Sequence, residues 1–158
     1  MEETFELKSF KLDPWGGAEV KYKISTTDEN EMTTEQEYHV KVTRRVHPDL
    51  EALFSKDLTA IVADILDNTE ITASLELGNV RIFPTGVSFA GKNDNIGMGI
   101  CGQYRTKAGR VIFKIPRIKY ITGENPYCVL MTVFADKLVS EVHAYLFEGK
   151  EGELLPFE

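Results

Sequence analysis

Residues 80–121 constrain the fold of this chain more than any other stretch. Short runs in which apolar and polar residues alternate are separated there by glycines and by an Asn-Asp-Asn cluster at residues 93–95. Alternation with a period of two is typical of half-buried β-strands, and glycine and asparagine are typical of the turns between them. The stretch therefore predicts neighbouring strands of one sheet.

Four or more strands are expected between two predicted helices, at residues 71–77, 80–89, 96–104, 110–115 and 118–121. The third of these alternates large apolar residues with small ones, so the small residues share one face of nearly bare backbone. The apolar positions are Ile96, Met98 and Ile100, and the small positions are Gly97, Gly99 and Cys101. Such a face admits the close approach of a helix, of a partner or of a ligand.

The N-terminal third predicts three further strands, at residues 5–12, 20–24 and 38–42. The apolar positions of the first change parity midway, which indicates a β-bulge or bend, and residues 13–17 are typical of a turn. The polar residues 25–34 between the other two strands predict a long exposed loop.

Two helices are predicted by apolar residues that recur every three or four positions. They open at Pro48 and Pro126, since proline is favoured at the first helical position, and they end near residues 67–68 and at Gly149. Each has one apolar face. The residues expected to be buried together are Leu58, Ile61, Val133, Phe134 and Leu138.

These elements predict a single two-layer α+β domain over residues 1–148, followed by an acidic C-terminal tail at residues 149–158. Both helices are expected on one face of a mainly antiparallel sheet of about seven strands. The two halves share the order of strands followed by a helix that opens with proline, which is consistent with a βββα pseudo-repeat.

Composition excludes several classes of protein. No apolar run approaches the roughly 18 residues of a membrane span, and the acidic N-terminus lacks the apolar part of a secretory signal, so we expect a cytoplasmic protein. Cys101 and Cys128 lack paired spacing, and His39, His47 and His143 have no spacing typical of a metal site or a catalytic triad. A non-enzymatic protein without metal or cofactor is therefore expected.

Charge is segregated along the chain. Residues 95–123 contain no aspartate or glutamate and contribute +6 to a total of −7, so the remainder carries −13. The six basic residues are Arg105, Lys107, Arg110, Lys114, Arg117 and Lys119. Tyr104, Phe113 and Tyr120 lie among them and offer rings on which bases can stack, so this hairpin predicts a weak surface for single-stranded nucleic acid.

Other roles for the basic hairpin remain open. Its side chains can be solvated, or pair with the acidic remainder of the same chain or of a neighbouring subunit. They can also hold the anion of a small phosphorylated signal, and a further alternative is the binding of a host protein. The bare glycine face and the uneven charge favour a homo-oligomer.

Two motifs carry a resemblance to known proteins. His47-Pro48-Asp49-Leu50 opens the first helix, and residues 85–97 read Thr-Gly-Val-Ser-Phe-Ala-Gly-Lys-Asn-Asp-Asn-Ile-Gly. Together they resemble a family of small uncharacterised proteins from the early regions of tailed phages and prophages, over about the middle half of the chain. The resemblance implies an accessory role in DNA replication or recombination, or an anti-defence role against the host. It implies no catalytic residue.

The tail carries a second resemblance. Leu155, Pro156 and Phe157 close an acidic segment and resemble the acidic Pro-Phe tip of bacterial single-strand DNA-binding proteins, although here Glu158 follows the phenylalanine. That resemblance implies a tail that binds a replication protein of the phage or of its host. The alternative is a tail that folds back onto the sheet.

Overall fold

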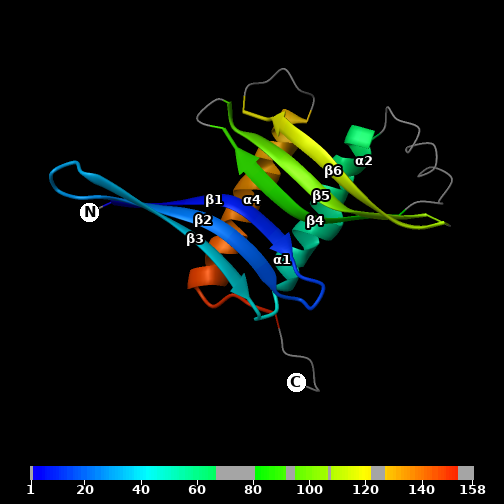
Figure 1. The fold of residues 1–158 in the computed structure, drawn as a ribbon, viewed down its shortest axis with the longest axis horizontal. Helices are drawn as coiled ribbons and strands as arrows, with labels where there is room; N and C mark the ends of the chain where they lie inside the picture. The colour runs from blue at the N-terminus through cyan, green and yellow to red at the C-terminus, as the bar shows by residue number, and fades with distance from the viewer. Residues whose placement is uncertain (1, 67–80, 92–94, 107, 122–126, 153–158) are drawn as a thin grey trace.

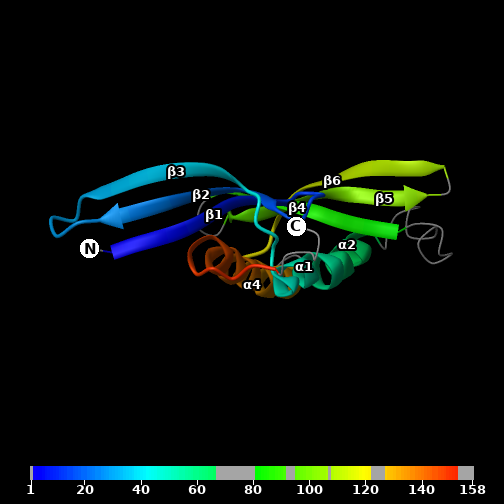
Figure 2. The same cartoon turned by 90° about the horizontal axis from the view of Figure 1, so that it is seen from below.

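The computed structural model describes residues 2–66, 81–91, 95–106, 108–121 and 127–152. Within these residues, six strands form one antiparallel sheet, and the helices lie together on one of its faces (Figures 1 and 2). The strands are β1 (Glu2–Leu12), β2 (Ala18–Thr27), β3 (Thr33–Val42), β4 (Arg81–Ala90), β5 (Gly97–Thr106) and β6 (Gly109–Lys119). The predicted α+β class is confirmed.

Strand order across the sheet is β3-β2-β1-β4-β5-β6. The described sheet has six strands where about seven were predicted, because residues 118–119 continue β6 and do not begin a new strand. The register of β6 against β5 shifts between Ile115 and Ile118, and Pro116, which has no N–H to donate, falls in this irregularity. The strand predicted at residues 71–77 lies outside the described residues.

The three N-terminal strands form two hairpins. The predicted bulge in β1 is confirmed by a register shift between Leu7 and Ser9. The predicted turn after β1 is also confirmed, since the Asp13 N–H donates to the Gly17 carbonyl at 2.9 Å. Each hairpin is antiparallel, so β1, β2 and β3 form a continuous half of the sheet.

The prediction of a long exposed loop at residues 25–34 is wrong. β2 and β3 stay paired as far as Thr27 and Thr33, whose hydroxyl oxygens lie 3.1 Å apart in a hydrogen bond. Threonine is β-branched and favours strands, so a polar ribbon forms where polarity alone indicated a loop. The connecting turn is short, and the Asp28 carboxylate accepts hydrogen bonds there from the N–H groups of Asn30 and Met32 at 2.9 Å each.

The first predicted helix is confirmed as a succession of α1 (Pro48–Ala52), a π-helical segment η1 (Leu53–Leu58) and α2 (Thr59–Leu66). Its N-cap is His47, whose Nδ1 accepts a hydrogen bond from the Asp49 N–H at 3.1 Å. The π-helical turn was not predicted. The Thr59 hydroxyl donates to the Phe54 carbonyl five residues earlier, at 2.8 Å.

The second helix, α4 (Cys128–Phe147), confirms the second prediction, although the predicted start at Pro126 lies outside the described part of the chain. Its buried stripe includes Phe134 and Leu138. The prediction that Val133 is buried is wrong, since 47% of that residue is exposed. Val133 is apolar but falls beside the stripe, which recurs every three or four residues. None of the described helices is long and apolar enough to cross a bilayer.

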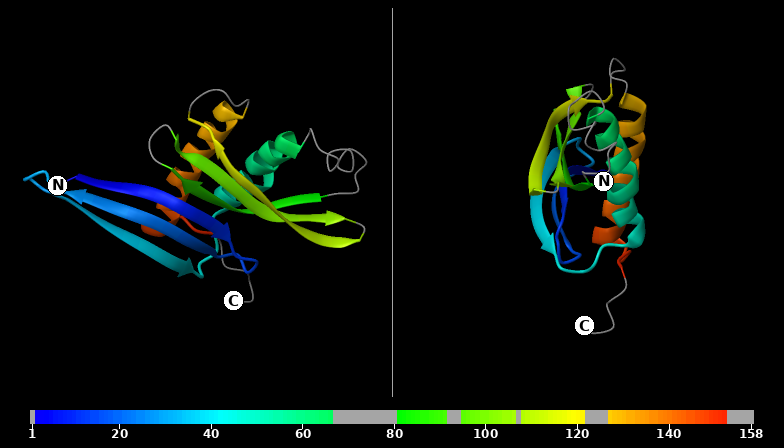
Figure 3. Two further views of the ribbon diagram at one scale, coloured as in Figure 1. Left: turned by 45° about the horizontal axis from the view of Figure 1, so that its top comes forward. Right: turned by 90° about the vertical axis from the view of Figure 1, so that its right-hand side faces the viewer.

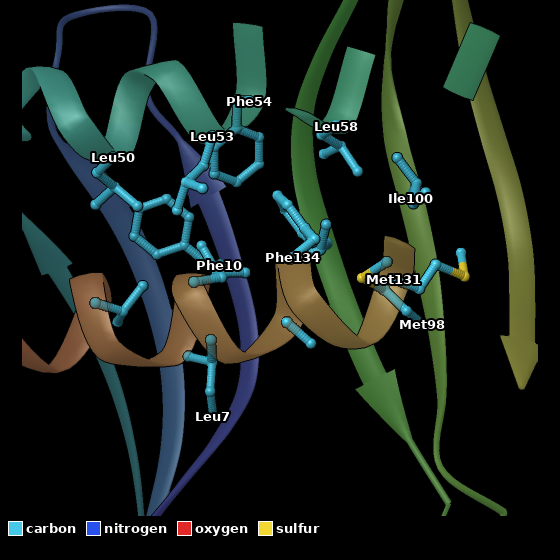
Figure 4. Packing of buried hydrophobic residues seen from close by; sticks show 14 of the residues in the cluster. Leu7, Phe10, Leu50, Leu53, Phe54, Leu58, Met98, Ile100, Met131 and Phe134 are labelled. Carbon is cyan, nitrogen blue, oxygen red and sulfur yellow. The ribbon is translucent and has the colours of Figure 1, made fainter. Parts of the chain in front are cut away.

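Side chains from the sheet and from both helices meet in one core. Phe10 of β1, Phe54 of η1 and Phe134 of α4 form a row, with ring centroids 5.6 Å and 6.2 Å apart (Figure 4). Leu58 and Ile61 are buried with them, as predicted. Figure 3 shows both helices on the same side of the sheet. No helix of the described residues lies on the opposite face of the sheet, and we call this face the open face.

The residues after α4 return to the start of the first helix. The Gly152 N–H donates to the Arg45 carbonyl at 2.7 Å, and Glu151 pairs with Val46 in an isolated β-bridge. The Lys150 ammonium lies 2.8 Å from the Glu141 carboxylate. These contacts attach the first residues of the predicted tail to the domain, while its proposed binding residues lie outside the described chain. Those are Leu155, Pro156 and Phe157.

Tyr145 of α4 gives a testable pH dependence. Its hydroxyl donates to the Arg44 carbonyl, and burial raises the pKa of Tyr145 to about 12, compared with about 10 in an unfolded chain. The folded protein holds this proton more tightly, so its contribution to stability is complete below about pH 10 and is lost as the pH rises toward 12.

We expect the free energy of unfolding to fall by about 2 kcal/mol more in the wild type than in Tyr145→Phe between about pH 9 and pH 12. Urea denaturation of both proteins at both pH values measures this difference. Tyr145→Phe is the control, because it lacks the hydroxyl proton that titrates in the wild type. Equal losses in the two proteins would contradict a buried, neutral Tyr145.

Candidate anion-binding face

The register of β5 and β6 assigns their side chains to the two faces of the sheet. Directly paired residues project from the same face, and the pair Ile100 and Ile115 is buried beneath the helices. Alternation along the strands then fixes the neighbouring pairs. The open face carries Cys101 with Lys114, Gln103 with Ile112, and Arg105 with Arg110; the helix side carries Gly102 with Phe113, and Tyr104 with Val111.

Five of the six predicted basic residues lie on β5 and β6 and are described, while Lys107 lies outside the described residues. Arg105, Arg110 and Lys114 occupy one face of this hairpin. Lys119 pairs with Gly97 on this face. The Arg117 side chain lies over Gly97, where an added Cβ would fall 2.3 Å from its Cγ.

The structure separates the predicted aromatic residues from the basic ones. The rings of Tyr104 and Phe113 stack at 6.3 Å on the helix side, and Phe113 covers Gly102, where an added Cβ would lie 2.9 Å from its Cζ. Tyr120 is buried. These three rings therefore do not share a surface with Arg105 and Arg110.

Phe83 is an aromatic residue of the open face that sequence reasoning missed. It pairs with Gln103, is 42% exposed, and carries the Arg105 guanidinium 5.2 Å above its ring centroid. A bulge between Pro84 and Gly86 reverses the side-chain alternation of β4. In a regular strand, Phe83 and Val87 would project from the same face, because they are four residues apart. Val87 is buried, so the sequence pattern alone indicates a buried Phe83 and gives no sign that Phe83 is exposed.

Two carboxylates on the N-terminal half of the open face, those of Glu6 and Glu19, have local partners. Glu6 lies 2.9 Å from the Lys8 ammonium and 3.2 Å from that of Lys23, and hydrogen bonding to these groups lowers the pKa of Glu6. Glu19 is hydrogen-bonded to His39, which lowers the pKa of Glu19. In the C-terminal half, no described residue of β4, β5 or β6 is acidic. Positive charge therefore dominates that half of the face.

The bare glycine face predicted for residues 96–104 is part of the open face. Close packing of a helix against it, one of the predicted alternatives, is wrong, because both helices lie behind the sheet. A depression of about 320 Å³ lies there instead, where β1, β2, β4, β5 and β6 meet. Its floor includes the small residues Ser9, Gly86, Ser88, Gly99 and Cys101.

The three histidines each have a local partner in the described chain. His39 and His143 each contact a glutamate, and His47 caps the first helix. No group of three or more His, Cys, Asp or Glu side chains in the described residues could hold a metal ion.

Comparison with known proteins gives no match: no family model fits the chain, and no curated protein and no solved structure matches it.

Proposed function

We propose that the open face of β4, β5 and β6 binds single-stranded nucleic acid, with this protein acting as a non-enzymatic, phage-type accessory factor of DNA replication or recombination. The observation that carries this proposal is the exposed Phe83 ring beneath the Arg105 guanidinium, in a row with Arg110 and Lys114. Single-strand binding surfaces combine a positive track for the phosphates with aromatic rings for the bases.

Electrostatics favours a single strand over a duplex. The chain carries a net charge of −7, which opposes general binding to duplex DNA but permits a local cationic site. Phe83 stands on a sheet face, where a base that is already unstacked from its neighbours can stack on the ring once the Arg105 guanidinium turns from the ring to a phosphate. The phosphates on either side of that base then face Arg105, Arg110 and Lys114, with no described acid on these strands to repel them.

Fluorescence anisotropy with a labelled oligothymidylate of about 12 nucleotides tests this proposal. Phe83→Leu should weaken binding about tenfold without changing its salt dependence, because it removes a stacking platform and no charge. Arg110→Gln should weaken binding and also reduce the slope of log affinity against log salt by about 0.7, the value for one phosphate contact on a single strand.

Lys56→Gln is the matched control, since it removes one exposed charge from the helix side of the molecule. It should leave affinity and salt slope unchanged. Equal weakening by Lys56→Gln and Arg110→Gln, or equal affinity for duplex and single strand, would count against the open face as the binding surface.

A second candidate is an anti-defence role in which the same face sequesters a small phosphorylated signal. The central depression favours it, because about 320 Å³ is the size of a small-molecule site.

Two further proposals concern the organisation of the chain and its assembly. The matching element order of the two halves supports a βββα pseudo-repeat, and the outer edges of β3 and β6, which have no neighbouring strand in the described sheet, support a homo-oligomer.

A further inference from the structure

The central depression lies where the two halves of the sheet meet. Three residue pairs join β1 to β4, whereas ten join β1 to β2 and nine join β4 to β5. Figure 3 shows the two three-stranded groups extending away from one another on either side of this junction. The depression is therefore built by both halves, and its lining comes from five of the six strands.

Small side chains create the depression. An added Cβ at Gly86 would lie 2.9 Å from the Cys101 Sγ, and one at Gly99 would lie 3.0 Å from the Ser88 Oγ. Larger residues at these positions would fill the space or displace its walls. The hydroxyl groups of Ser9 and Ser88 lie in the lining and can donate hydrogen bonds to an anion.

Charged side chains surround this floor. Lys11, Lys21 and Lys114 come from three different strands and are exposed, and none of them forms an ion pair with another described residue. Among the described residues of the lining, the one acid is Glu19, whose carboxylate is hydrogen-bonded to His39. The lining therefore carries a net charge of +2 when Glu19 is ionised.

We infer that the depression seats a nucleotide bearing a terminal phosphomonoester. Such a group carries about two negative charges near neutral pH, which matches the charge of the lining, whereas an internal phosphodiester carries one. A volume of about 320 Å³ accommodates one nucleotide but not a run of them. The inference rests on the proposed function in one respect: the phosphorylated nucleotide is the end of a strand whose remainder follows β4, β5 and β6.

Oligothymidylates of about 12 nucleotides, labelled at an internal base, provide the test. Three are compared by anisotropy: one with a 5′-phosphate, one with a 3′-phosphate and one with hydroxyl groups at both ends. One of the phosphorylated strands should bind about tenfold more tightly than the hydroxyl strand, because charge-assisted hydrogen bonds hold the additional charge. Calorimetry with thymidine 5′-monophosphate and with inorganic phosphate measures the free ligands.

The double variant Lys11→Gln with Lys114→Gln should abolish the preference for the phosphorylated end, so that its affinities for the three strands agree within about twofold. The matched control is Lys41→Gln with Lys56→Gln, which removes the same charge outside the depression and should keep the preference. The ratio of affinities is the readout, so a general loss of attraction to DNA does not mimic the effect.

The outcomes separate this inference from the proposed function. If all three strands bind equally well, the terminal site is refuted and strand binding stands. If no strand binds but the monophosphate binds in a manner that requires Lys11 and Lys114, the depression is a site for a free nucleotide and strand binding is refuted. If no strand and no free ligand binds, both are refuted.

Discussion

Phe134→Ala should lower the free energy of unfolding by about 3–5 kcal/mol, the range measured for truncating a fully buried phenylalanine. Phe134 is 1% exposed and its ring meets that of Phe54 edge to face at 6.2 Å, between the two helices and the sheet. Alanine there leaves a cavity at the point where all elements of the core meet.

Val133→Ala is the matched control for this substitution. Val133 is the preceding residue of the same helix but is 47% exposed, so its truncation should cost less than about 1 kcal/mol. Urea denaturation followed by circular dichroism measures both variants. Similar losses in the free energy of unfolding for the two variants would mean that α4 buries a different face from the one that carries Phe134.

Gly102→Ala should cost about 3 kcal/mol, the second large effect that we expect on stability. The new Cβ would lie 2.4 Å from the Phe83 carbonyl oxygen and 2.7 Å from the Pro84 Cα. Both are backbone atoms of the neighbouring strand, so relief of the clash requires β4 and β5 to separate where their hydrogen bonds join them.

The control for Gly102 lies on the opposite face of the same strand. In Gly99→Ala the closest contact is with the Ser88 Oγ at 3.0 Å, and this side-chain atom can rotate away. We expect Gly99→Ala to stay within about 1 kcal/mol of the wild type. Thermal or chemical denaturation of the pair measures the difference, and a larger loss for Gly99→Ala than for Gly102→Ala would contradict the assigned faces of β5.

The helices were predictable because their evidence is local. Pro48 and the apolar residues after it specify a helix start and a buried face within a single segment, and the structure confirms both. Val133 shows the limit of such patterns. It is apolar and helical, and the neighbouring elements, which a one-dimensional pattern does not contain, decide that it stays outside the core.

The candidate site was predictable only in part. The acid-free basic segment was visible in the sequence, and the structure gathers Arg105, Arg110 and Lys114 on one face. The exposure of Phe83 depends on a bulge, and the cluster of Lys11, Lys21 and Lys114 depends on the pairing of distant strands. Neither the exposure of Phe83 nor the lysine cluster can be predicted from local composition, because register and sheet order decide which residues are neighbours across strands.

The short pairing between β1 and β4 makes the helix layer responsible for joining the two halves of the protein. The helix that follows β3 packs through η1 and α2 against β4, a strand of the other half, and α4 contacts both α1 and η1. The reverse also holds, because Phe147 of α4 packs edge to face against Phe5 of β1 and Tyr22 of β2, so each half helps to bury the interior of the other. A chain that carried one half alone would therefore lack part of the packing that buries its interior side chains.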